Sequence, residues 1–394
     1  MSWSSGAYSA ARVWVVAGII AALGLAESIA ERQSVEDLPQ EPKSAIEPLD
    51  VRPLMPVESG RNDSNPVWSP SGSLIAFERS RGERKEIVIA RPDGTVVQSI
   101  YFQLSETSRE PKFFFPGVVE DVSYNAGITW SPAGDRLVFM SNGGAGNYDL
   151  YLRERDGKTV RLTDHKEKDG HAHWSPVADQ LVFVSGRTGK GDIYLLDVAT
   201  RAVTRLTWGG NPYLYPQWSP DGKKIVMIHG SNENHDIYLI EDVLKTGDAL
   251  KALTGWTYDD LRPVWSPDGR KVAFYSNYSP TGDPRVWAIL VVAADGSDPL
   301  QGEGLAAKVV ATDVVPDVER GPAWMPDSNR IVYVRNAEQE YNPIYIADLV
   351  RKTNLPLKTE TKMNHDVACS AHGVIAFRAQ VNQWDQLFLA RLRD

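Results

Sequence analysis

Short apolar runs separated by turn residues recur along the chain. Runs such as LVFV at 181–184, IVMI at 225–228 and VAFY at 272–275 are continuous, as expected for strands that are covered on both faces. A turn signal precedes each run, and it reads Ser-Pro-Asp-Gly at Ser219–Gly222 and Ser266–Gly269. Proline followed by Asp-Gly favours a type I turn. The pattern therefore predicts antiparallel strands joined by tight turns.

The same phrase returns at a regular interval. It begins with a tryptophan followed by Ser-Pro or Met-Pro, and most copies lie about 45 residues apart, which is typical of a propeller blade with four short strands. A seventh, weaker copy places Cys369 where the tryptophan is expected. We predict an all-β, seven-bladed β-propeller; six blades is the alternative if the weak copy stands outside the ring. The six tryptophans are Trp68, Trp130, Trp174, Trp218, Trp265 and Trp324.

The two ends of the repeat region predict how the ring closes. The last copy ends with DQLFLARLRD at 385–394, its third strand, and no fourth strand follows. Segment Asp50–Pro56 stands just before the first copy, where every other copy has its fourth strand. We expect this segment to complete the last blade, because pairing the two ends removes an exposed sheet edge. We interpret the tryptophans as structural side chains buried between blades.

Composition narrows the classes of function. The net charge of −9 disfavours nucleic acid as a partner, because phosphate binding requires a basic surface. Cys369 is the only cysteine, so no intrachain disulfide or thiolate metal cage can form. No nucleophile elbow of the Gly-x-Ser-x-Gly type occurs. We expect no cofactor.

The N-terminal region predicts export. Arg12 precedes an apolar run, Val13–Ala26, which is short for a membrane span but fits the core of a signal peptide. We assign residues 1–30 to a signal peptide, with an uncleaved anchor as the alternative. Residues 31–50 form an acidic, proline-containing linker, and 51–394 form the propeller. The expected location is the periplasm or the exterior of the cell.

Strand direction predicts one functional face, which we call the entrance face. It consists of the loops that precede each inner strand together with the loops between the second and third strands. Asp and Asn are frequent five positions before the tryptophans, and we interpret them as turn caps. The residues three positions before each tryptophan differ more from copy to copy. Exposed aromatic side chains make good protein anchors, so we expect contacts from His171, Trp208, Tyr215, Trp256, Arg262 and Asp366.

Other candidate chemistry is weaker. His171, His229, His235 and His365 could share a metal ion on the entrance face, but they lack a fixed-spacing metal signature. We interpret them as ordinary polar loop groups. The insertion at 105–126 contains KFFFPG, and we expect these phenylalanines to plug the mouth of the channel.

The phrases WSPDGKKIV at 218–226, DIYLIED at 236–242 and LKALTG at 250–255 resemble the TolB-type WD-like propeller repeat. The resemblance covers 51–394 and implies a β-propeller, export, and binding of other envelope or periplasmic proteins rather than catalysis. TolB carries an α/β domain before its propeller, whereas here only the linker precedes it, so we expect a propeller-only member. Peptide or glycan ligands remain open. The alternatives implied by related propellers are a metal-assisted oligogalacturonate-type lyase and a non-catalytic subunit of a larger periplasmic enzyme.

Overall fold

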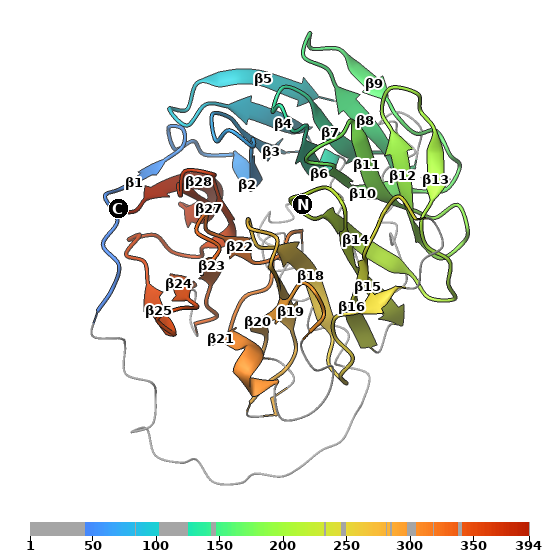
Figure 1. The fold of residues 1–394 in the computed structure, drawn as a ribbon. Coiled ribbons are helices and arrows are strands. Elements are labelled where there is room, and N and C mark those ends of the chain that lie inside the picture. Colours follow the sequence, from blue (N-terminus) through green and yellow to red (C-terminus); the bar gives the residue numbers. More distant parts are fainter. Residues whose placement is uncertain are drawn as a thin grey trace, which may run out of the picture.

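The computed structural model describes residues 44–393 apart from 83, 102–124, 143–146, 232–233, 246–249, 281, 284–285, 298–304, 318 and 338–340. The predicted signal peptide and the phenylalanines of KFFFPG lie outside these residues. Seven four-stranded antiparallel sheets form a ring (Figure 1). The seven-bladed prediction is confirmed, and the weak seventh copy is a full blade. Among the described residues, no helix is both long and apolar enough to span a membrane.

Each blade runs from an inner strand to an outer strand, and the first four blades follow directly from the repeat. Blade one contains β2 (Asn62–Trp68), β3 (Ile75–Arg81), β4 (Arg84–Ala90) and β5 (Val96–Tyr101). Blade two contains β6 (Asn125–Trp130), β7 (Leu137–Ser141), β8 (Asp149–Arg153) and β9 (Thr159–Arg161). Blade three contains β10 (Asp169–Trp174), β11 (Gln180–Ser185), β12 (Asp192–Asp197) and β13 (Val203–Arg205). Blade four contains β14 (Tyr213–Trp218), β15 (Ile225–Ser231), β16 (Asn234–Ile240) and β17 (Lys251–Ala252).

The remaining blades keep this order, and the last one is completed from the other end of the chain. Blade five contains β18 (Asp260–Trp265), β19 (Lys271–Ser276), β20 (Ala288–Ala293) and β21 (Val309–Thr312), with the short 3-10 helix η3 (Ala306–Lys308) before β21. Blade six contains β22 (Ala323–Trp324), β23 (Arg330–Val334), β24 (Ile344–Asp348) and β25 (Thr353–Pro356). Blade seven contains β26 (His365–Cys369), β27 (Ile375–Val381) and β28 (Trp384–Arg391), and its outer strand is β1 (Asp50–Pro53).

The closure prediction is confirmed. Strand β1 pairs antiparallel with β28, and Val51 stands opposite Ala390. The residues before β1 also touch blade six, because the amide of Ile46 donates to the carbonyl oxygen of Pro356 at 2.8 Å. The N-terminal segment therefore contacts two neighbouring blades.

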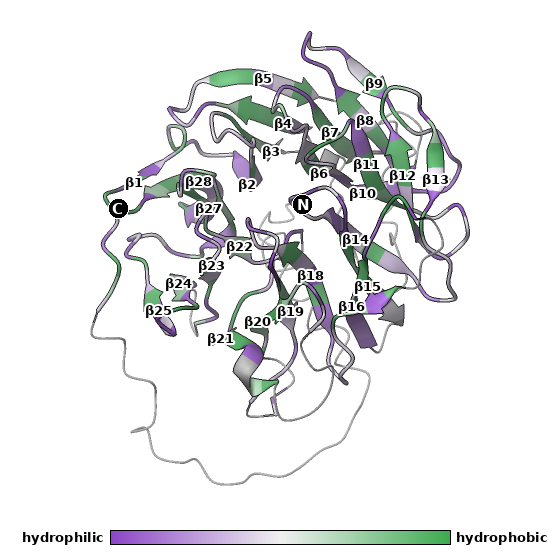
Figure 2. Ribbon diagram, viewed as in Figure 1, coloured by the Kyte–Doolittle hydropathy of each residue, from purple (hydrophilic) through white to green (hydrophobic). Residues whose placement is uncertain are grey.

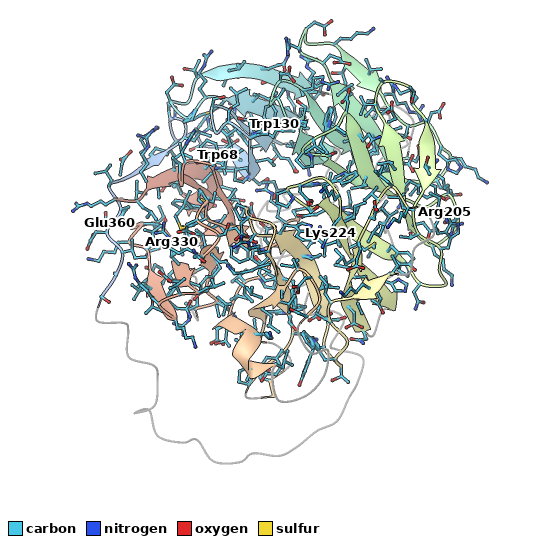
Figure 3. All side chains as sticks on the ribbon, viewed as in Figure 1. Trp68, Trp130, Arg205, Lys224, Arg330 and Glu360 are labelled. Carbon is cyan, nitrogen blue, oxygen red and sulfur yellow. The ribbon has the colours of Figure 1, made fainter. Side chains whose placement is uncertain are left out.

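The tryptophans join neighbouring blades, as the sequence predicts. Five are buried and Trp68 is half-buried; Trp68 and Trp130 lie on adjacent inner strands (Figure 3). The indole N–H of Trp130 donates to the carbonyl oxygen of Val67 at 3.1 Å, in the preceding blade. Trp265 and Trp324 make the equivalent bond, each to a carbonyl oxygen of the preceding blade, those of Gln217 and Val264. Trp68 donates to Ala368 of blade seven at 3.4 Å, so the same contact crosses the closing joint.

The core lies within and between the blades. Middle strands such as β4 and β20 are strongly hydrophobic and the connecting loops are mostly hydrophilic (Figure 2). Phe77, Phe139, Phe183, Phe274 and Phe377 occupy equivalent places in their blades and are fully buried. Burial of this kind stabilises by about 25 cal/mol per Å² of apolar surface.

Candidate functional site

The inner strands share a bulge three residues before the tryptophan position. In six blades the pairing between the inner strand and its neighbour shifts register across this residue. The backbone there is left-handed, with φ between 49° and 62°. The six residues are Asn65, Gly127, His171, Tyr215, Arg262 and Asp366.

This bulge carries an energetic argument. A left-handed backbone suits glycine and is tolerated by Asn and Asp, whereas a larger side chain adds strain of about 1 kcal/mol or more. Gly127 shows that glycine can occupy the position in this repeat. His171, Tyr215 and Arg262 hold it with large side chains in three consecutive blades. The backbone conformation therefore does not explain why large side chains stand at this position. A function of the side chains themselves would explain it.

The structure brings together these three side chains, which lie on the inner strands of blades three, four and five. The imidazole of His171 meets the edge of the Tyr215 ring, with centroids 4.3 Å apart. The guanidinium carbon of Arg262 lies 3.3 Å from the centroid of the Tyr215 ring. Nη1 of Arg262 also donates to the carbonyl oxygen of Glu319 at 3.2 Å. We call His171, Tyr215 and Arg262 the axial triad.

Asp366 belongs to a separate, charged network on blades seven and one. Its carboxylate lies 2.7 Å from Nε of Arg378 and accepts the backbone N–H of Asn65 at 3.3 Å. Burial alone would raise the pKa of Asp366, but Arg378, His365 and Arg320 together lower it. Burial and the charge of Asp366 raise the pKa of the neighbouring Asp317.

The turn-cap prediction for the residues five positions before the tryptophans is wrong for Asp63 and Asp169. Asp63, Asp169 and Asp260 are buried. Asp63 accepts bonds from Arg79 at 2.7 and 3.0 Å, and Asp169 accepts bonds from Arg187 at 3.2 and 3.3 Å. These carboxylates thus bind guanidinium groups on or after the next strand instead of capping turns. Asp260, among the described residues, binds neither a guanidinium group nor a turn amide.

The two predicted tryptophan anchors differ in exposure. Trp208 is 52% exposed, and the guanidinium of Arg205 lies 5.6 Å from its ring. Arg205 stands on the outer side of the ring of blades (Figure 3), so this anchor lies toward the rim of the molecule. Trp256 is half-buried, stacks 6.4 Å from Phe274 and packs against the main core cluster. Of the two, Trp208 has the more accessible surface.

The four histidines proposed as metal candidates have separate surroundings. His171 contacts Tyr215, and His229 stacks on Tyr213 with centroids 4.0 Å apart. Nδ1 of His235 lies 2.9 Å from the Asp259 carboxylate, and Nε2 of His365 lies 3.4 Å from Asn342. Within the described parts of the chain, no three His, Cys, Asp or Glu residues are grouped so as to hold a metal ion.

Sequence reasoning missed the shared left-handed conformation. A signal was present, because Asn65, Gly127 and Asp366 all stand three positions before a repeat tryptophan or its equivalent. Asn, Gly and Asp are the residues that tolerate positive φ best. The ion pairs of Asp63 and Asp169 were also missed, because they depend on strand register.

Comparison with known proteins identifies the repeat. A comparison with curated protein sequences gives no match. The family model of the TolB beta propeller domain matches residues 117–301, the part that holds the best-formed copies of the repeat. The chain is a β-propeller that carries TolB-type repeats over these residues. TolB from Acinetobacter baumannii is 20% identical over 76% of this chain, with a TM-score of 0.49, and the TolB-like chain spans 64% of its length.

Two solved enzymes share the fold over most of their length. Oligogalacturonate lyase from Vibrio parahaemolyticus is 12% identical, with a TM-score of 0.63, and the match covers 89% of the TolB-like chain and 96% of the lyase. An oligogalacturonate lyase in complex with manganese is 14% identical, with the same coverages and a TM-score of 0.60. At these identities the likeness shows the propeller fold alone.

Proposed function

We propose that this TolB-like propeller is a protein-interaction module that binds its partner through the entrance face, in the periplasm or outside the cell. The observation that carries the proposal is the axial triad. Three large side chains occupy a strained backbone position that glycine fills in blade two. Strain of this kind is concentrated at functional sites, where the surrounding structure maintains it.

The loops of this face support one another. The amide of Gly186, after β11, donates to the carbonyl oxygen of Lys168 before β10 at 2.9 Å. His235 after the β15–β16 turn pairs with Asp259 before β18. The first contact joins two loops of blade three, and the second joins blade four to the loop that leads into blade five. Trp208 provides an exposed aromatic side chain toward its rim, of the kind that often anchors protein partners.

Affinity capture from an envelope extract tests this proposal. Wild-type chain, Trp208→Ala, Arg262→Ala and Leu244→Ala serve as baits. Leu244 is 92% exposed in the loop between β16 and β17, on the opposite face. We expect the same partner with wild type and Leu244→Ala, and a loss of roughly tenfold or more with the other two variants. Equal recovery by all four baits, at equal melting temperatures, would contradict the proposal.

The metal-assisted lyase is the alternative from another class. The two solved lyases have the same fold, but no observation among the described residues favours this activity here. The interaction module is therefore the function that the site supports best.

A further inference from the structure

The arginines near the inner strands differ in what neutralises them. Arg378 contacts the carboxylates of Asp366 and Asp385, at 2.7 and 2.9 Å. Arg79 and Arg187 contact buried aspartates. Arg262, in contrast, has a carbonyl oxygen and an aromatic ring as its contacts. Among the described residues it forms no ion pair with a carboxylate.

The position of the Arg262 guanidinium leaves donors available. A guanidinium carries five N–H groups in one plane. A carbon-to-centroid distance of 3.3 Å requires the guanidinium plane to lie against the Tyr215 ring. Its N–H groups then point sideways from the ring, and one of them is used by Glu319. Arg262 is half-buried, so a charge held there is only partly screened by water.

The backbone around Arg262 is built for this arrangement. Its φ of 56° costs stability that glycine would avoid. In the next blade Gly321 lies so close that a side chain would collide with the Arg262 carbonyl oxygen and with Cγ2 of Val264. The absence of a side chain at Gly321 therefore permits the close approach that places the Glu319 carbonyl on the guanidinium.

Charged groups nearby are already engaged. Asp366 pairs with Arg378, and Arg320 lies within electrostatic reach of Asp317 and Asp366. Arg320 also donates to the carbonyl oxygen of Pro66. Burial, together with the charge of Asp366, raises the pKa of Asp317. Arg262 and Arg320 are therefore the two arginines here that form no ion pair with a carboxylate among the described residues, and Arg262 is the one stacked on a tyrosine ring.

We propose that Arg262, stacked on Tyr215 beside His171, is a binding site for a carboxylate group carried by an acidic residue of the protein partner. A guanidinium and a carboxylate match in shape and form paired, charge-assisted hydrogen bonds. Tyr215 holds the guanidinium plane, so that little side-chain freedom is lost on binding. This inference rests on the proposed function, because it names the chemistry by which the partner is recognised.

Three probes test the assignment in calorimetric titrations of the full chain at low salt. The first is the peptide Gly-Ser-Glu-Ser-Gly with both ends blocked, the second is its Gln counterpart, and the third is free glutarate. Arg262→Gln removes the charge, and Arg262→Lys keeps the charge but loses the planar fork. Arg270→Gln is the matched control, because Arg270 is exposed in the turn on the opposite face.

We expect the Glu peptide to bind wild type and Arg270→Gln alike. Binding to Arg262→Gln should be roughly 10- to 100-fold weaker, the effect of losing a charged hydrogen-bonding partner, with Arg262→Lys in between. Equal binding of the Glu and Gln peptides, no binding of any probe, or an unchanged affinity of Arg262→Gln would overturn the proposal. Binding of glutarate without the Glu peptide would overturn the assignment to a protein-borne carboxylate.

The two proposals can fail separately. Loss of partner capture by Trp208→Ala without any binding of the Glu peptide would leave the interaction face in place and remove the carboxylate site. Binding of the Glu peptide through Arg262, with no partner captured by any bait, would support the carboxylate site and contradict the proposed interaction module.

Discussion

Asp260 is an exception among equivalent residues. Asp63 and Asp169 occupy the same place in blades one and three, and each binds an arginine. Asp260 is fully buried, and neither of its carboxyl oxygens makes a hydrogen bond of good geometry with any described residue. Burial raises the pKa of Asp260 to about 8, although Ser276, Thr254 and Trp256 lie close enough to lower it. The side chain is therefore held mainly in its neutral form.

This protonation predicts how stability depends on pH. An unfolded aspartate has a pKa of about 3.9, so the folded chain keeps a proton that the unfolded chain releases. The free energy of unfolding should then fall as the pH rises from about 4 to about 8. Asp260→Asn mimics the neutral side chain and should raise the melting temperature at pH 8, by roughly 2–4 °C or more, and by less at pH 5. Differential scanning calorimetry measures both values.

Asp169→Asn is the matched control for this experiment. Asp169 is equally buried, but its carboxylate binds Arg187. Its replacement should lower the melting temperature at both pH values, because a partly buried guanidinium loses its partner. If Asp260→Asn behaved like Asp169→Asn, the neutral state of Asp260 would be refuted.

At the scale of single elements, the bulged inner strand is the decisive feature. Gly127 and Gly321 stand at the same place in blades two and six. The atoms nearest to a methyl group at Gly127 would be those of the Met140 side chain, at 3.7 to 3.9 Å. A methyl group at Gly321 would collide with Val264 and with the Arg262 backbone. The two glycines are therefore present for different reasons.

These glycines give a paired prediction. Gly127→Ala keeps a φ of 62° and should cost about 1 kcal/mol through backbone strain. Gly321→Ala should cost roughly 3 kcal/mol or more, because the strand must move. Urea unfolding compares the two variants. Equal costs would show that the close approach at Gly321 does not constrain blade six.

The strands themselves were largely predictable from the sequence. Continuous apolar runs, Pro-Asp-Gly turns and recurring tryptophans identify elements because each is a local signal. The bulge was not predicted, since a single left-handed residue leaves the apolar period of its strand nearly unchanged. The stacking of Arg262 on Tyr215 joins two blades, and no local pattern encodes a contact of that kind.

At the scale of the whole molecule, closure depends on a strand of four residues, β1. Its pairing with β28 removes what would otherwise be an open sheet edge. The closure was predictable because the last copy of the repeat lacks a fourth strand. The additional contact of Ile46 with blade six was not, because nothing in the repeat marks it.

A disulfide across this joint tests how much closure stabilises the ring. Val51 and Ala390 stand opposite each other in the antiparallel pair, where Cα distances permit a disulfide. Oxidised Val51→Cys/Ala390→Cys should unfold with a free energy roughly 2–5 kcal/mol higher than its reduced form. The half-buried Cys369, whose pKa desolvation raises to about 12, should not interfere. A stability unaffected by oxidation would mean that the joint opens independently of the blades.

The β1–β28 joint also has a consequence for the order of folding. Asp50 pairs with Arg391, so the ring cannot be completed until the chain has been synthesised as far as β28. Contacts of such long sequence separation form slowly. A chain interrupted before β28 would carry an unpaired β1 and an incomplete blade seven, both open to association with other incomplete chains. Synthesis as far as β28 is thus itself a condition for a sealed ring.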